Sequence, residues 1–245
     1  MDFSKLIHFI WFQGIALAPA TSRDVPAHWQ HMNHDYEVRV WDEQSLHDFI
    51  VTKYPQYLKR WHALPQVIKK CDMARLLLIH HYGGVYLDMD LIPQSPLHEF
   101  FDQRKIYHMG MQHRSILPNS PPVDVDFASR EFILSREYAN IDYAGCGVAN
   151  GVILSKAKLP MWIEFVEEQI DQPNNRVLEF MGPHALTRFL RRRAATLNGR
   201  GLIVPPYYFL WEDHAMKQPA PSWCVSKHLA VNHWGDHTKP RWWEV

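Results

Sequence analysis

A short apolar strand that ends in two carboxylates is the feature that most narrows the folds open to this chain. It lies in residues 82–90, with the sequence YGGVYLDMD. Side chains alternate faces along a strand, so Asp88 and Asp90 are expected to point the same way while Met89 turns toward the interior. Two carboxylates at the end of a strand suit a hard divalent cation that keeps open positions for a diphosphate.

The preceding segment predicts a helix over residues 66–81. Pro65 suits a first helical turn, and apolar residues recur at the 3.6-residue spacing of a helix face. Asp72 and Arg75 fall on that face, at i and i+3. Buried charges are costly unless they are paired or used. Two readings follow: a structural ion pair that ties the helix to the next strand, or a pair that binds hydroxyl groups of a ligand.

A glycine pair joins this helix to the strand. Gly83 and Gly84 can adopt positive φ, and we expect them to let the backbone approach a ligand closely. Helix, glycines and strand together should place the four charged side chains around one crevice. Ligands of α/β sheets favour the crevice outside the carboxyl ends of the strands.

Alternation of strands and helices predicts an α/β fold with a mostly parallel central sheet flanked by helices. We expect one domain over residues 1–245, and a loop over the site or exposed surface at the polar stretch 112–130. Strands are predicted at 6–11, 36–41, 85–88, 105–110, 148–154, 202–205 and 228–233. Helices are predicted at 43–52, 55–62, 66–81, 160–170 and 183–196.

Charge and composition exclude several classes of protein. Lysine and arginine number 26, as do aspartate and glutamate, and this balance argues against a general nucleic-acid binder. No apolar run approaches the ~18 residues of a membrane-spanning helix, and no secretory signal is evident. Three cysteines without paired spacing indicate a reducing compartment, and we expect a cytoplasmic location.

Residues 70–75 (KCDMAR) followed by 82–90 resemble the Asp-X-Asp sugar-binding region of glycosyltransferase family 32. That family includes bacterial capsule and lipopolysaccharide transferases and yeast mannosyltransferases of the initiating type. The chain is also similar to the catalytic domain of the large clostridial glucosylating toxins. Segments 7–14, 36–42 and 230–234 agree with the family's first strand, second strand and closing histidine motif.

The resemblance implies a GT-A type fold and a metal-dependent, retaining transfer of a hexose. The donor would be a UDP- or GDP-hexose, the cofactor Mn²⁺ or Mg²⁺, and the acceptor a glycan or glycolipid of lipopolysaccharide, capsule or exopolysaccharide synthesis. The implied catalytic residues are Asp72, Arg75 and Asp90. The implied donor-binding residues are Trp11, Asp72, Arg75, Gly83, Gly84, Tyr86, Asp88 and Asn150, and the implied metal ligands are Asp88, Asp90 and His233.

Several assignments have alternatives. Trp11 suits a core aromatic as well as a ring that stacks on the donor base. Asn150 and Gly151 together suit a hairpin turn, which is the alternative to a donor-sugar contact of Asn150. Asn232 is an alternative contact to His233. For the whole protein the rivals are a metal-dependent nucleotide-sugar hydrolase and a non-catalytic nucleotide-sugar or glycan-binding protein.

A local basic cluster marks the second half of the chain. It consists of Arg188, Arg191, Arg192, Arg193 and Arg200. Such a run is either a solvated helix face or a surface that meets anionic lipid headgroups or a phosphorylated acceptor. The terminal segment 240–245 adds two tryptophans of the kind found at membrane interfaces. The sequence therefore predicts peripheral contact with the inner face of a membrane as one option.

Overall fold

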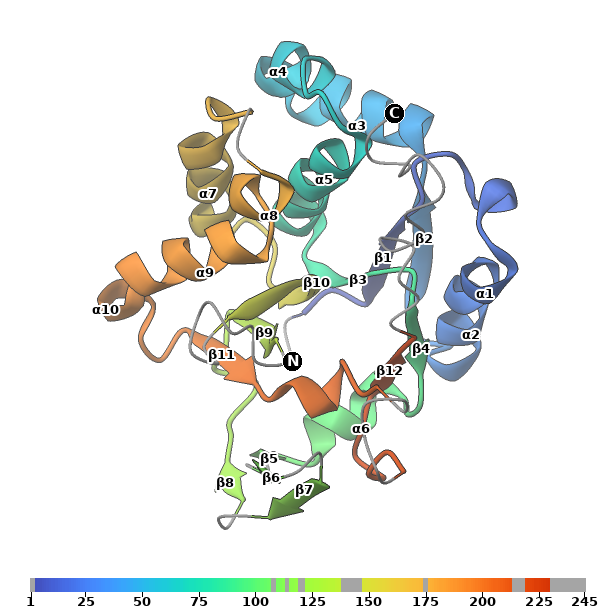
Figure 1. The fold of residues 1–245 in the computed structure, drawn as a ribbon, viewed down its shortest axis with the longest axis vertical. Coiled ribbons are helices and arrows are strands. Elements are labelled where there is room, and N and C mark those ends of the chain that lie inside the picture. Colours follow the sequence, from blue (N-terminus) through green and yellow to red (C-terminus); the bar gives the residue numbers. More distant parts are fainter. Residues whose placement is uncertain are drawn as a thin grey trace.

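A six-stranded sheet forms the centre of the molecule (Figure 1). The computed structural model describes residues 3–106, 109–112, 115–118, 122–137, 147–173, 176–212 and 219–229. The strand order is β11-β9-β10-β3-β1-β2, and β10 runs antiparallel to both of its neighbours while the other neighbouring pairs are parallel. The strands are β1 (Leu6–Ile10), β2 (Glu37–Trp41), β3 (Gly84–Leu87), β9 (Phe132–Arg136), β10 (Val148–Ser155) and β11 (Gly201–Val204).

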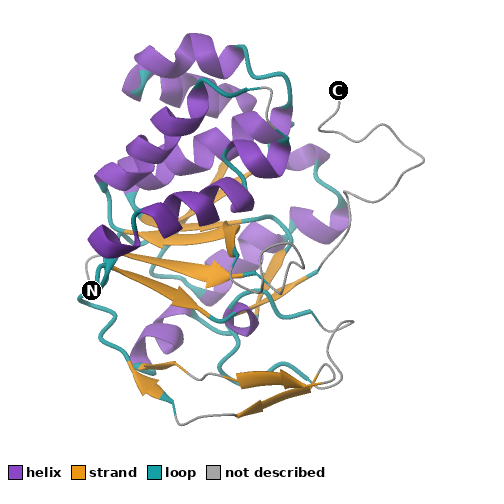
Figure 2. Ribbon diagram, turned by 60° about the vertical axis from the view of Figure 1, so that its left-hand side comes forward, coloured by secondary structure: helices purple, strands orange, loops and turns teal. Residues whose placement is uncertain are grey.

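Each face of the sheet carries its own hydrophobic core. Side chains alternate along the strands, so Ile153 of β10 joins one core while Val152 and Leu154 join the other. Figure 2 shows most helices stacked on one side of the sheet. The helices of this first core are α3 (Glu43–Lys53), α4 (Leu58–His62), α5 (Val67–Tyr82), α7 (Pro160–Ile170), α8 (Val177–Phe180) and α9 (Pro183–Arg192), with α10 (Ala194–Leu197) following α9.

The second core lies under α2 (Val25–Met32) and α6 (Leu97–Asp102). Three two-stranded sheets lie outside the central one. They pair β4 (Leu91–Pro93) with β12 (Ser226–His228), β5 (Lys105–Ile106) with β8 (Val123–Asp124), and β6 (Met109–Gln112) with β7 (Ser115–Pro118). Short helical turns complete the described fold at α1 (Ala20–Arg23), Ile15–Leu17, Pro55–Tyr57 and Pro206–Tyr208.

The predicted α/β fold with a mostly parallel sheet is confirmed, but not every predicted strand joins the central sheet. Segment 105–110 and the described part of 228–233 contribute to the small sheets rather than the central one. Strand β9, which lies inside the central sheet, has no predicted counterpart. Asn150 and Gly151 lie within β10, so the hairpin alternative for them is wrong. The pairing of β10 with β9 shifts register there.

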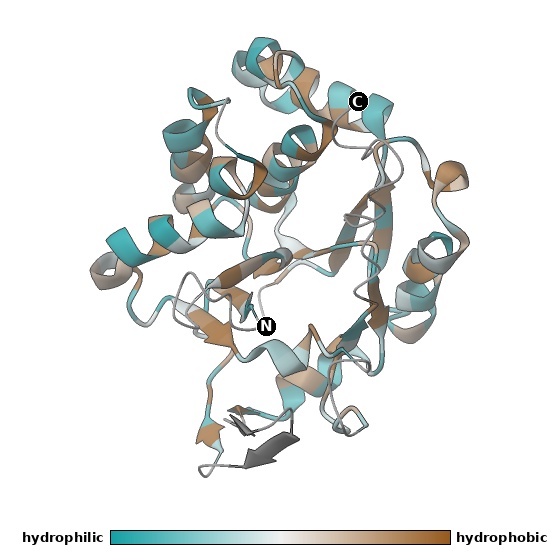
Figure 3. Cartoon of the chain, in the orientation of Figure 1, coloured by the Kyte–Doolittle hydropathy of each residue, from teal (hydrophilic) through white to brown (hydrophobic). Residues whose placement is uncertain are grey.

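Helix α5 is buried on nearly all sides because it packs between the sheet and α7. Figure 3 shows the alternation of hydropathy along the helices of this layer. The helix therefore carries Asp72 and Arg75 into the interior. Among the described residues, no helix combines the length and the apolar character needed to cross a membrane.

A buried histidine in β1 makes stability depend on pH. The His8 ring is fully buried, with Nε2 3.1 Å from the Gly83 carbonyl oxygen, and Nδ1 accepts a hydrogen bond of 3.2 Å from Trp41 Nε1. Nδ1 accepts only when the ring is neutral. Burial lowers the pKa of His8 from 6.5 to about 4, although the Gly83 hydrogen bond opposes this shift.

We expect His8 to reduce stability as pH falls below 6.5. The unfolded state binds the proton more tightly, so the free energy of unfolding should fall by about 3 kcal/mol in total by pH 4. Urea unfolding at pH 7 and pH 5 measures this dependence. His8→Asn keeps an acceptor for Trp41 but does not titrate, and it should make the curve less steep; His80, whose pKa burial also lowers to about 4, keeps contributing. An equally steep curve in that variant would contradict the assignment.

Candidate active site

Arg75 forms the centre of a buried polar network at the carboxyl end of β3. Its Nη2 lies 3.0 Å from Asp72 Oδ1, and its Nη1 lies 3.3 Å from Asp88 Oδ1. Nη1 also donates a 2.8 Å hydrogen bond to the Asn150 carbonyl. The Asp72 and Arg75 side chains are only 3% and 5% exposed, whereas Asp88 is 41% exposed. One guanidinium therefore joins α5, β10 and the turn after β3, and it holds a carboxylate that reaches solvent.

Tyr86 contacts both Arg75 and Asp88. The Arg75 guanidinium carbon lies 4.7 Å from the centre of the Tyr86 ring, within the range of a cation–π contact. The Tyr86 hydroxyl donates a 2.9 Å hydrogen bond to Asp88 Oδ1. Burial raises the pKa of Tyr86 well above its ordinary value, so the hydroxyl keeps its proton and remains a donor. Tyr86 is thus placed to orient Asp88 and to support Arg75.

The ion pair between Asp72 and Arg75 fits the structural reading of these residues. Asn150 Nδ2 donates a 3.0 Å hydrogen bond to the Asp72 oxygen that also faces Arg75. Burial raises the pKa of the Asp72 carboxyl to about 6, against the opposing effect of Arg75. Nε of Arg75 is buried and has no hydrogen-bond partner within the described residues. The pair therefore ties α5 to β10, and direct contact with a sugar remains a prediction.

Asp88 and Asp90 lie in a turn rather than in a continuing strand. Strand β3 ends at Leu87, and Leu91 N donates to Asp88 O at 3.2 Å, which closes the turn. The argument from strand alternation is therefore wrong for these carboxylates, although Met89 is buried as expected. The two carboxylates consequently have different neighbours: Asp88 faces Arg75, while Asp90 faces a histidine.

Space for the Asp88 carboxylate depends on a glycine in the neighbouring strand. Asp88 N donates a 2.9 Å hydrogen bond to the Gly151 carbonyl, and a Cβ added at Gly151 would lie 2.4 Å from Asp88 Oδ2. Asparagine followed by glycine in β10 thus has two separate roles. Asn150 fixes Asp72, while Gly151 leaves room for Asp88.

Gly151→Ala should displace the Asp88 carboxylate and lower affinity for a metal–nucleotide ligand by about 10–100-fold, the usual effect of disturbing a site's supporting residues. Titration of Mn²⁺ with GDP or UDP measures this affinity. The control is to repeat the substitution in a protein that already carries Asp88→Ala. Gly151→Ala should not lower the affinity further there, because the carboxylate that it displaces is gone. Additive losses in the double variant would contradict the steric explanation.

Asp90 has a partner that the sequence did not reveal. Its Oδ2 lies 3.1 Å from His228 Nε2, and His228 Nδ1 lies 3.0 Å from Glu212 Oε1. Burial alone lowers the pKa of His228, but the hydrogen bonds with Asp90 and Glu212 outweigh it and raise the pKa to about 10. Asp90 and His228 are 138 positions apart, and no local spacing signals their contact.

The glycine pair lies at the opposite end of β3 from Asp88. Gly83 and Gly84 have φ of 65° and 88°, in the region that favours glycine. A Cβ on Gly84 would lie 2.3 Å from the Leu6 carbonyl oxygen, and one on Gly83 would lie 2.6 Å from Ala157 N. The tight connection between α5 and β3 accounts for both glycines. The proposed ligand site therefore does not include them.

Trp11 follows β1 at the same edge of the sheet as Asp88, because β1 and β3 are parallel. Its backbone N donates a 2.9 Å hydrogen bond to the Trp41 carbonyl, and its half-buried side chain packs against the second core. This position is compatible with base stacking, which stays a prediction. His233 and Asn232 lie outside the described residues.

The chemistry of the two carboxylates fits a hard divalent cation. Within the described residues, Asp88 Oδ2 and Asp90 Oδ1 accept no hydrogen bond, so each carboxylate keeps one oxygen available. Carboxylate oxygens are ligands that Mg²⁺ and Mn²⁺ favour. The described part of the chain contains no group of three histidine, cysteine or acidic residues suited to hold a metal. Donor phosphates and a residue elsewhere would have to complete the shell.

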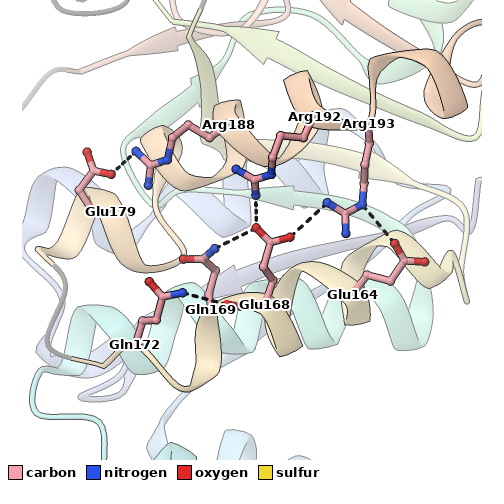
Figure 4. A network of polar contacts seen from close by, with 8 residues as sticks. All are labelled: Glu164, Glu168, Gln169, Gln172, Glu179, Arg188, Arg192 and Arg193. Carbon is pink, nitrogen blue, oxygen red and sulfur yellow. Dashed lines mark hydrogen bonds and ion pairs between the residues drawn. The ribbon is translucent and has the colours of Figure 1, made fainter.

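The predicted basic cluster is largely neutralised by glutamates (Figure 4). Ion pairs with glutamates within the described residues favour a structured helix face over a free cationic surface. Arg188 pairs with Glu179, Arg192 with Glu168, Arg193 with Glu164 and Glu168, and Arg200 with Glu131. The predicted tail, residues 240–245, lies outside the described residues.

Part of the chain that contains this site matches a known family. Residues 19–108 match the family described as the glycosyltransferase sugar-binding region containing the DXD motif. The predicted family resemblance is confirmed for this segment. The DXD region spans α5 and β3, and so contains Asp72, Arg75, Asp88 and Asp90. Trp11, Asn150 and His228 fall outside it.

A curated relative is similar to part of this chain. Inositol phosphoceramide mannosyltransferase 3 of Schizosaccharomyces pombe (strain 972 / ATCC 24843) is 30% identical over 94 residues, which cover 36% of this chain and 24% of the relative. The match therefore spans about a quarter of that relative's length.

The solved structures confirm the fold. PaToxG Glycosyltransferase superposes with a TM-score of 0.53 at 17% identity, covering 80% of this chain and 72% of its own. The ligand-free glycosyltransferase domain from the YGT toxin superposes with a TM-score of 0.51 at 10% identity, covering 83% and 80%. The expected GT-A type architecture is thus confirmed.

Proposed function

We propose that the protein is a nucleotide-sugar glycosyltransferase that moves a hexose from a nucleoside diphosphate to a hydroxyl group of a glycan or glycolipid. The observation that carries this proposal is the buried Arg75 network inside a DXD region. Through it, Asp88 is presented to solvent at the sheet edge where ligands of α/β folds bind.

Asp88 and Asp90 would hold Mn²⁺ or Mg²⁺ together with the donor's diphosphate. A cation held by these residues would supply positive charge to offset the charge that grows on the departing nucleoside diphosphate. Arg75 and Tyr86 keep Asp88 in place through the contacts described above. His233 is the proposed third protein ligand, Trp11 the proposed stacking partner of the base, and retention of anomeric configuration the expected stereochemistry.

Mannose is the first sugar to test. The relative from Schizosaccharomyces pombe is named as a mannosyltransferase of inositol phosphoceramide. This supports GDP-mannose as the donor and a hydroxyl of a glycolipid or polysaccharide as the acceptor. UDP-hexoses are the alternative donors. A cytoplasmic location at the inner face of a membrane stays a prediction.

A thermal-shift screen with purified protein tests the proposal. GDP, UDP, CDP and their sugars would each be added with and without Mn²⁺, because a ligand that binds only the folded state raises the melting temperature. We expect one nucleotide diphosphate to stabilise the protein only when Mn²⁺ is present. No response to any nucleotide with Mn²⁺ would overturn the proposal.

A second measurement distinguishes a transferase from the two rival functions. With the stabilising donor and Mn²⁺, a hydrolase would release the free sugar rapidly in the absence of acceptor, and a non-catalytic binding protein would leave the donor intact in all conditions. A transferase should release nucleotide faster when acceptor glycans are added.

A further inference from the structure

His228 occupies a bridging position between two acidic side chains from separate parts of the chain. Its Nε2 lies 3.1 Å from Asp90 Oδ2, and its Nδ1 lies 3.0 Å from Glu212 Oε1. The three side chains are between 20% and 29% exposed, so they are shielded from water more than a typical surface pair. Both ring nitrogens therefore face carboxylate oxygens.

Backbone contacts fix this alignment on both sides. His228 lies opposite Leu91 in the pairing of β12 with β4, and Leu229 N donates a 2.9 Å hydrogen bond to the Asp90 carbonyl. On the other side, His228 N donates a 2.7 Å hydrogen bond to the Trp211 carbonyl, next to Glu212. Three adjacent backbone segments thus hold the Asp90, His228 and Glu212 side chains in line.

We propose that His228, oriented by Glu212, is a positioning residue that holds Asp90 in the geometry needed for a metal–diphosphate ligand. This inference rests on the proposed function. A hydrogen bond to Oδ2 restricts rotation of the carboxylate, and Oδ1 remains available for a ligand. Partners that orient a ligating carboxylate typically contribute about 10–100-fold to metal affinity.

Two substitutions separate the two hydrogen bonds of the ring. The amide nitrogen of glutamine can take the place of Nε2, so His228→Gln keeps a donor for Asp90. The amide of asparagine takes the place of Nδ1, so His228→Asn keeps the contact with Glu212 and loses the one with Asp90. The variants are both neutral amides, and they differ mainly in which carboxylate they reach.

Binding of Mn²⁺ in the presence of saturating GDP, and of UDP in a parallel series, is the test. Electron paramagnetic resonance of free Mn²⁺ gives the affinity without any turnover. We expect His228→Asn to weaken Mn²⁺ binding about 10–100-fold and His228→Gln to restore it to within a few-fold of the parent. In an Asp90→Asn background, His228→Asn should have no further effect.

The melting temperature without ligand controls for folding. A structural role alone would lower Mn²⁺ affinity equally in both amide variants, or would leave it unchanged in both, and either result would overturn the inference while the parent still binds. If the parent protein binds no Mn²⁺ with either nucleotide, the proposed function fails together with the inference.

Discussion

Asp90→Asn is expected to lower donor turnover by about 10³-fold while leaving the fold intact. The substitution removes a charged ligand oxygen from the proposed metal site, and loss of metal assistance removes several kcal/mol of transition-state stabilisation. The amide oxygen can still accept a hydrogen bond from His228, so the turn between β3 and β4 should keep its shape. Nucleotide release from the donor selected by thermal shift measures the effect.

A surface carboxylate provides the control for this loss of charge. Asp48 on α3 is 65% exposed and lies outside the network around Arg75. Asp48→Asn should therefore turn over the donor at the parent's rate. Parent-like activity in Asp90→Asn would remove Asp90 from the catalytic machinery and with it the metal assignment.

Arg75→Ala is expected to lower the free energy of unfolding by about 3–5 kcal/mol and to abolish activity. Removing one member of a buried ion pair leaves the other charge without compensation, which is the costly way to break such a pair. Here Asp72 would remain buried, with the Asn150 amide as its hydrogen-bond donor. Urea unfolding at neutral pH measures the change.

A double variant separates stability from function. Asp72→Asn together with Arg75→Met removes both charges and keeps comparable volumes, so it should regain at least half of the lost stability. Activity should stay absent, because Asp88 would no longer be held. A loss below about 1 kcal/mol in Arg75→Ala would contradict the account of Arg75 as the buried centre of the site.

The local part of the site could be predicted from the sequence. Asp72, Arg75 and Asp88 lie within one helix–strand unit, and the 3.6-residue periodicity of α5 together with the short strand β3 brings them together. The prediction failed where it assumed that the strand continues beyond Leu87. Leu91 N closes a turn there, and that turn gives Asp90 a different set of neighbours from Asp88.

Contacts between residues far apart in the chain could not be predicted from the sequence. His228 meets Asp90 because β12 pairs with β4, and this pairing depends on tertiary packing rather than on any local pattern. The antiparallel direction of β10 is a similar case: its apolar run predicts a strand, but its direction appears only in the pairing with β3 and β9. The role of Gly151 follows from that direction, because only then does Asp88 lie against it.

A crystal structure of the protein with Mn²⁺ and the stabilising nucleotide diphosphate tests the central claim most directly. We predict density for the metal and the diphosphate at the carboxyl end of β3, in contact with Asp88 and Asp90, and a base beside Trp11. Nucleotide bound elsewhere, or a metal that contacts neither carboxylate, would contradict the proposed site and the transfer mechanism built on it.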